Sequence, residues 1–176
     1  MIDITYKPAE QGDVAAIAGI HVVSWRDAYA SILSSDFLAG PIEVDRSALW
    51  TERLSNPPIN LLVETAQGPN QRILGFIAAY FDHDLRWGSL VDNLHVLPEV
   101  RGLKIGENLL RSIARQLQAR GEKTGLHLWV FEANHAGLRF YQRLGGAVVE
   151  SEASNMPAAN GQKVLRVYWR QMLGLI

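Results

Sequence analysis

Residues 94–106 read Leu-His-Val-Leu-Pro-Glu-Val-Arg-Gly-Leu-Lys-Ile-Gly, and the helix-forming stretch Glu-Asn-Leu-Leu-Arg-Ser-Ile-Ala follows at once. The apolar run predicts a strand that breaks at Pro98, a turn through Arg101 and Gly102, and then a helix. The first N–H groups of a helix have no partner within it, and the helix dipole is positive at that end. Such a turn is suited to hold an anion, most often a phosphate.

The composition sets the outer limits of what the chain can be. Its 176 residues fit one domain, which we expect to cover residues 1–176. A net charge of −1 gives no reason to expect a nucleic-acid partner. The chain has no cysteine, which excludes disulfides, a thiolate nucleophile and cysteine-bound metal, and fits a reducing compartment. Neither a signal-peptide pattern nor a membrane-length apolar run occurs, so we expect a soluble cytoplasmic protein with no membrane partner.

Strand-like and helix-like segments alternate along the chain. The patterns predict strands at residues 2–7, 60–65, 72–81, 87–97, 126–131, 147–150 and 163–172. They predict helices after Asp13 and at residues 41–54, 107–120 and 134–144, with a loop at 154–161. The order βααβββαβαββ indicates the α/β (α+β) class, with a mixed, mostly antiparallel central sheet flanked by helices.

Two familiar phosphate sites do not fit the turn. A P-loop ends in Gly-Lys-Ser or Gly-Lys-Thr, which occurs nowhere in the chain, and a dinucleotide fingerprint needs glycines and an acidic residue that are missing. The remaining pattern, from Arg101 to Gly106 after a strand and a proline, resembles the GNAT N-acetyltransferase superfamily. There it binds the pyrophosphate of acetyl-coenzyme A. Lys104 departs from the usual glycine, which costs conformational freedom if the turn is helical there. Its charge either compensates the pyrophosphate or is solvated.

A second segment supports the same resemblance. Residues 134–146 read Asn-His-Ala-Gly-Leu-Arg-Phe-Tyr-Gln-Arg-Leu-Gly-Gly. This is similar to the later segment of the superfamily, except that Gly137 stands for the usual alanine and Gly146 for the usual aromatic residue. The resemblance covers residues 60–150 closely and implies a GNAT fold with acetyl-coenzyme A as co-substrate.

The resemblance also assigns the coenzyme site. The strand Leu94, His95 and Val96 would hold the pantetheine arm, with the main-chain groups of Leu94 and Val96 pairing to it as to a strand. The residues that would hold the pyrophosphate are Arg101, Gly102, Leu103, Lys104, Ile105, Gly106 and Glu107. Asn134 would hydrogen-bond the coenzyme or the loop beside it.

Acetyl transfer needs a proton donor for the thiolate and an acceptor for the amine proton. The resemblance places Tyr141 beside the coenzyme sulfur, where it would protonate the thiolate if its pKa is lowered or matched; alternatively it only packs its helix on the sheet. Asp92 occupies the position of the general base, directly or through water. Strict alternation puts His95 on the opposite face from Asp92, where a structural role is expected.

The acceptor is a primary amine of a small molecule or of a protein, and the sequence does not choose between them. Trp25 and Tyr29, four residues apart on one helical face, correspond to the acceptor wall of the superfamily, although this spacing is also typical of a core. Direct attack is expected, because no cysteine can carry the acetyl group, and no metal-ligand spacing is present. The alternative is a noncatalytic acyl-coenzyme A binding or sensing module. A homodimer could form through the C-terminal strand with Val167, Tyr168 and Trp169.

Overall fold

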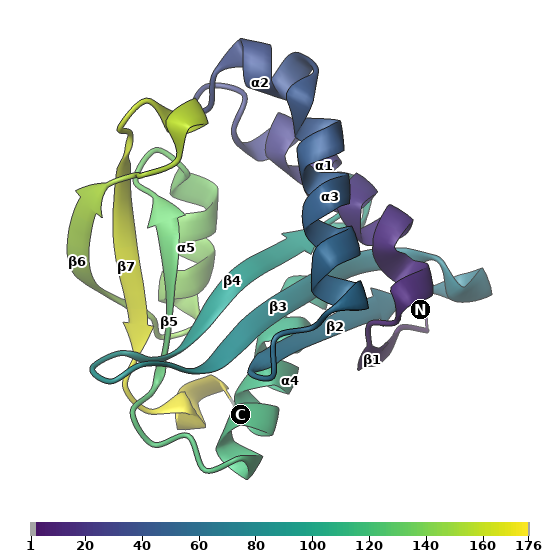
Figure 1. The fold of residues 1–176 in the computed structure, drawn as a ribbon. Helices are drawn as coiled ribbons and strands as arrows, with labels where there is room; N and C mark the ends of the chain where they lie inside the picture. The colour runs from purple at the N-terminus through teal and green to yellow at the C-terminus, as the bar shows by residue number, and fades with distance from the viewer. Residues whose placement is uncertain (1–2, 176) are drawn as a thin grey trace.

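A seven-stranded sheet runs through the computed structural model, which describes residues 3–175 (Figure 1). Its strands are β1 (Thr5–Pro8), β2 (Leu61–Gln67), β3 (Ile73–Asp84), β4 (Gly88–Val96), β5 (Leu126–Phe131), β6 (Ala147–Ala153) and β7 (Lys163–Trp169). Their order across the sheet is β1-β2-β3-β4-β5-β7-β6, and all neighbours are antiparallel except β4 and β5. The predicted fold class, mixed and mostly antiparallel, is confirmed.

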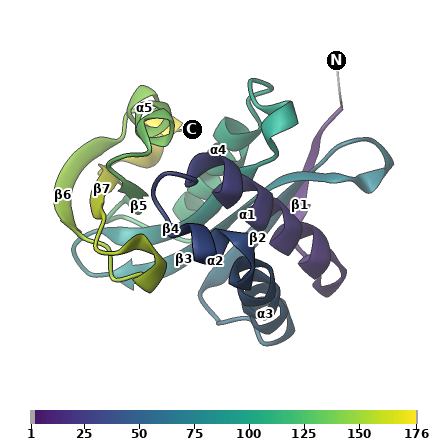
Figure 2. The same cartoon turned by 90° about the horizontal axis from the view of Figure 1, so that it is seen from above.

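Helices cover both faces of this sheet (Figure 2). One face carries α1 (Val14–Ala28), α2 (Ser35–Ala39) and α3 (Pro41–Ser55), and the other carries α4 (Ile105–Ala119) and α5 (His135–Arg143). The five-residue helix α2 was not predicted, because it is too short to show a periodic pattern; Ser34 caps it by accepting a hydrogen bond from the Phe37 N–H at 3.3 Å.

The helix after the anion-binding turn follows directly from its sequence. Leu109, Leu110, Ile113 and Leu117 lie on one face of α4 and are fully buried against the sheet. Gly121 ends the helix in a left-handed conformation with φ +87°, as predicted. The helix begins at Ile105, two residues before the predicted start, so the turn that precedes it is tighter than expected.

A β-bulge and a divergence of two strands create the space for the site. The pairing of β3 with β4 shifts between Ala78 and Ala79, which leaves Asp92 as the extra residue of β4. The pairing of β4 with β5 ends at Val91 and Leu128, and the two strands then separate, as Figure 1 shows. Within residues 3–175, the backbone of β4 beyond Val91 therefore has no strand on its β5 side.

The last strand differs from its prediction. It ends at Trp169, not at Met172, and it lies between β5 and β6. Val167 and Trp169 are buried, and both edges of β7 are paired, so the strand offers no free edge to a second copy. The expected homodimer therefore cannot form by pairing a second copy with the edge of β7; β6 forms this edge of the sheet. The first strand covers residues 5–8 where 2–7 was expected, and Ile2 lies outside the described residues.

Candidate active site

A cleft of about 770 Å³ opens where β4 and β5 separate. Its walls come from the end of α1, the end of β4, the turn before α4, the loop after β5, and α5. The predicted residues that line it are Tyr29, Leu94, His95, Val96, Arg101, Gly102, Lys104, Ile105, Gly106, Glu107, Asn134 and Tyr141. Residues far apart in the sequence thus meet at one place.

Three predicted residues do not line the cleft. Trp25 is 7% exposed and packs in the core, with its ring 5.7 Å from that of Tyr29 and the Arg46 guanidinium 4.7 Å above it. The Leu103 side chain is 46% exposed and lies outside the cleft. Asp92 is placed at the apex where β4 and β5 part, beside the cleft.

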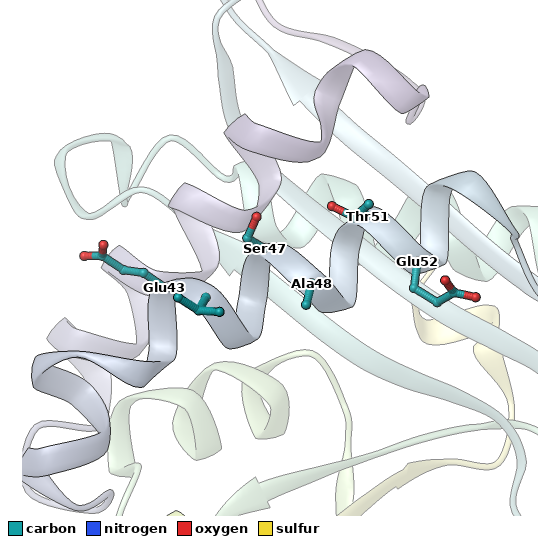
Figure 3. A pocket seen from close by; sticks show the side chains of 6 residues that line it. Glu43, Ser47, Ala48, Thr51 and Glu52 are labelled. Atoms are coloured by element: carbon teal, nitrogen blue, oxygen red, sulfur yellow. The ribbon is translucent and has the colours of Figure 1, made fainter.

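A second hollow lies on the outer side of α3 (Figure 3). Glu43, Ser47, Ala48, Thr51 and Glu52 line it together with Val44, so every lining side chain comes from one helix. None of the predicted site residues lines this hollow, and no element other than α3 contributes a lining residue.

The turn before α4 and the first turn of this helix line the cleft. Gly102 has φ +86° and Lys104 has φ +60°, so the chain passes through the left-handed region twice before the helix begins. Lys104 is therefore not in the helical conformation considered from the sequence; it is a non-glycine residue in a conformation that favours glycine. The N–H groups of the first turn, at 105–107, have no partner inside the helix and can receive an anion.

Charged side chains surround this turn. Arg101 pairs with Asp27 of α1, with Nη1 2.5 Å from Oδ2. Glu107 contacts Arg111 at 3.0 Å and Arg143 of α5 at 3.6 Å. Both carboxylates at the cleft are thus compensated by arginines, and Lys104 adds a further cation. The arrangement favours a ligand with several negative charges.

Two tyrosines, Tyr29 and Tyr141, line the cleft. Burial raises the pKa of the Tyr29 hydroxyl to about 12, and a hydrogen bond with the Asn134 side chain opposes this rise. Burial, and next the proximity of Tyr29, raise the pKa of Tyr141 well above its usual value. Tyr141 therefore stays protonated at neutral pH. Its pKa is not lowered toward that of a thiol, which suits a hydrogen-bond donor better than an acid that ionises.

Asn134 fixes the start of α5. Its Oδ1 accepts the Gly137 N–H at 3.0 Å, and a Cβ on Gly137 would lie 2.6 Å from its Nδ2. The glycine that replaces the usual alanine thus leaves room for this cap. Tyr141, two turns further along, packs its ring edge-on against Phe140 and Trp169. The residue therefore contributes to the packing of α5 and also lines the cleft.

The bulge in β4 changes the faces predicted from strict alternation. Asp92 pairs with Arg53 of α3 at 2.7 Å, and His95 Nδ1 lies 3.0 Å from Ser24 Oγ of α1. Both side chains therefore face the helices α1 and α3, whereas opposite faces were expected. A bulge adds one residue to the strand and so reverses the alternation beyond it.

His95 belongs to a group of polar and aromatic side chains, which extends from the cleft into the core and which the sequence did not reveal. Its ring stacks on His21 at 4.5 Å, and His21 Nδ1 accepts the Trp50 Nε1–H at 3.0 Å. Burial lowers the pKa of His95 to about 3 and that of His21 well below 6.5, so both imidazoles are neutral. Ser24 and Arg53 were also missed, because a lone serine or arginine on a helix carries no motif.

Two features are absent from residues 3–175. No group of three or more histidine, aspartate or glutamate side chains in this part of the chain could hold a metal ion. None of the helices in the same range has the length and apolar character to cross a membrane.

Comparison with known proteins gives one family and one fold. The model of the acetyltransferase (GNAT) family matches residues 24–146. The PaiA N-acetyltransferase of Thermoplasma acidophilum, solved in complex with coenzyme A, is 19% identical, with a TM-score of 0.74 over 95% of this chain and 99% of that chain. A GCN5-related N-acetyltransferase of Rhodopseudomonas palustris is 18% identical, with a TM-score of 0.75 over 97% and 98%. Arabidopsis thaliana NAA60, solved with a bisubstrate analogue, is 17% identical, with a TM-score of 0.68 over 95% and 97%.

Proposed function

Because the chain belongs to the GNAT acetyltransferase family, we propose that it transfers an acetyl group from acetyl-coenzyme A to a primary amine by direct attack in a ternary complex. The observation that carries this proposal is the cleft between β4 and β5, which ends on the free N–H groups of α4. The unpaired side of β4 suits the thioester arm of the coenzyme, and the N–H groups of α4 suit its anionic phosphates.

The coenzyme would lie along the cleft with its two chemical parts held differently. The pyrophosphate would accept hydrogen bonds from the N–H groups of 105–107, with Arg101 and Lys104 nearby. The pantetheine amides would pair with the free side of β4 at Leu94 and Val96, in the place that β5 leaves. This supports the residues expected from the sequence as the coenzyme-binding set, apart from Leu103, whose side chain lies outside the cleft.

The transfer step uses neutral groups. The amine nitrogen forms a bond to the thioester carbon, the C–S bond breaks, and the proton that the nitrogen gives up ends on the sulfur. Tyr141 donates a hydrogen bond to the sulfur as its negative charge develops, which its protonated state allows. An acceptor that arrives as an ammonium first loses its extra proton to Asp92, directly or through water.

Calorimetric titration with acetyl-coenzyme A tests the coenzyme site. A Cβ on Gly106 would lie 3.5 Å from Phe140 Cζ and 3.6 Å from Val96 Cγ2, so the indole of Gly106→Trp would fill the cleft. We expect wild type to bind and this variant not to bind. Gly12→Trp is the control, because a Cβ on Gly12 meets nothing within 4 Å. Wild type that does not bind acetyl-coenzyme A would contradict the proposal.

Thiol release with a panel of amines tests the reaction itself. Coenzyme binding together with acetyl transfer is the expected result. Coenzyme binding without transfer to any amine would instead favour the noncatalytic acyl-coenzyme A binding or sensing module. The ion pair between Asp92 and Arg53 favours this noncatalytic alternative, because it occupies the carboxylate that would otherwise accept the amine proton.

A further inference from the structure

We propose that the acceptor is a small molecule with an anionic group beside its primary amine, as in an amino acid, and that Arg53 binds this anionic group. The inference rests on the proposed acetyl transfer and narrows its acceptor. It excludes a protein amino group as the preferred substrate, because a lysine side chain or a peptide N-terminus has no carboxylate next to its amine.

The position of Arg53 is the first argument. Its Nη1 lies 2.7 Å from Oδ2 of Asp92, the first residue of β4 beyond its last pair with β5. This is the apex of the space that would hold the thioester. An amine that approached the carbonyl carbon from the side of α1 and α3 would lie close to Arg53 and Asp92, which stand beside the cleft at this apex.

The guanidinium is held ready for a ligand. It lies 5.2 Å from the ring centre of Trp50 and 5.7 Å from that of Tyr80, and the Arg53 side chain is only 16% exposed. Its planar donors are thus fixed by two aromatic rings, so little side-chain entropy remains to be lost when they bind an anion.

Arg53 also retains donor capacity. Its Nη1 is buried, and although it lies close to Asp92, no acceptor in the described residues meets the direction of its N–H bonds. A buried N–H without a well-aligned acceptor is unfavourable, and a planar carboxylate that accepts two parallel hydrogen bonds from the guanidinium would relieve this.

The two opposite charges match a zwitterion. The carboxylate of an amino acid can replace Asp92 as the partner of Arg53, and its ammonium can then pair with Asp92. The exchange frees the Asp92 carboxylate to take one proton from the ammonium, which leaves the neutral amine for attack. Binding of the anionic group thereby prepares the proton acceptor, which an amine without that group cannot do.

Amino acids and their amides form the decisive comparison. Each pair has the same amine and side chain, and only the carboxylate is replaced by a neutral amide. We expect wild type to show kcat/KM at least about tenfold higher for the acids, calculated on the concentration of free amine, since a close ionic contact is worth about this factor. Arg53→Gln should remove the preference, mainly through KM for the acids, and Arg53→Lys should keep part of it.

The control is Arg46→Gln. Arg46 lies on the same helix, also above a tryptophan ring, and has its own carboxylate partner in Asp45. We expect it to retain the preference for acids. Unfolding temperature and coenzyme affinity show whether Arg53→Gln keeps its fold; if it does not, the comparison of acids with amides in wild type decides alone.

Other results would overturn the inference. Amides that react as well as acids in wild type would contradict it, and so would an Arg53→Gln variant that keeps the full preference. Efficient acetylation of peptides or of amines without an anionic group would reject this acceptor class while leaving the acetyl transfer intact. Failure to bind acetyl-coenzyme A would reject both proposals, which separates the two failures.

Discussion

Arg101 and Asp27 form an ion pair across the mouth of the cleft, with Nη1 2.5 Å from Oδ2, although they are 74 residues apart in the sequence. The pair joins the anion-binding turn to the last turn of α1. Both side chains are about half exposed, at 48% and 45%, so the pair itself adds little to stability. It places a carboxylate beside a site that should receive an anionic coenzyme.

Asp27→Asn should therefore tighten coenzyme binding. The change removes the negative charge and leaves Arg101 free for the phosphates, and we expect the Kd for acetyl-coenzyme A to fall by about fivefold at low salt. Titration calorimetry at two salt concentrations measures this. Glu43→Gln, which breaks the exposed pair of Glu43 with Arg26 outside the cleft, is the control. Weaker binding by Asp27→Asn would mean that Asp27 orients Arg101 for the ligand instead.

Lys104→Gly should stabilise the protein. Lys104 has φ +60°, and a non-glycine residue in this conformation costs about 1 kcal/mol relative to glycine, partly offset by the flexibility of glycine in the unfolded chain. We expect the free energy of unfolding in urea to rise by about 0.5 kcal/mol or more. Lys104→Ala loses the same charge but keeps the strain, so a gain in both variants would assign the effect to the charge.

Tyr141→Phe should lower the rate without changing coenzyme affinity. The phenol hydroxyl is the only group removed, and loss of one donor to a developing negative charge costs about 10²-fold to 10³-fold in kcat. Steady-state kinetics and calorimetry measure the two effects separately. Tyr168→Phe is the matched control, because its hydroxyl donates to the Thr124 carbonyl outside the cleft. An unchanged kcat in Tyr141→Phe would reduce Tyr141 to a packing role.

The sequence predicted the elements whose information is local. Helix α4 was predicted from four of its buried apolar residues and from Gly121, and the anion-binding turn from the proline and glycines around Arg101. The residues of the coenzyme cleft followed from two such segments and the resemblance that they carry. The local pattern was sufficient for these elements because each segment packs against a single face of the sheet.

The features that were missed depend on tertiary structure. Nothing in the Asp92-Asn93 pair indicates a bulge, yet one extra residue reverses the face of every side chain beyond it. In the sequence, Arg53 is an ordinary polar residue of a helix, and only the packing of α3 on the sheet places it in an ion pair with Asp92. The sequence also did not show that β7 lies between β5 and β6, because strand order is set by crossovers and not by the strand's own residues.

The buried histidines predict an acid-sensitive fold. Burial, and then the nearby Arg46 and Arg101, lower the pKa of His95 to about 3; burial and Arg166 lower that of His127 to about 4. In the unfolded chain both return to about 6.5. The unfolded state thus binds more protons than the folded state below pH 6.5, so the stability they contribute is complete above this pH and is lost as the pH falls toward 4.

Urea unfolding between pH 7.5 and 5 checks this, since carboxylates titrate mostly below that range. Each such histidine should add about 1.4 kcal/mol per pH unit to the slope once the pH is well below 6.5. His127→Gln should reduce the slope by about that amount, because the glutamine carbonyl can still accept the Arg166 Nη1–H that His127 Nδ1 accepts at 2.8 Å. If the slopes of wild type and variant coincide, His127 takes up its proton equally in the folded and unfolded states, contrary to its burial.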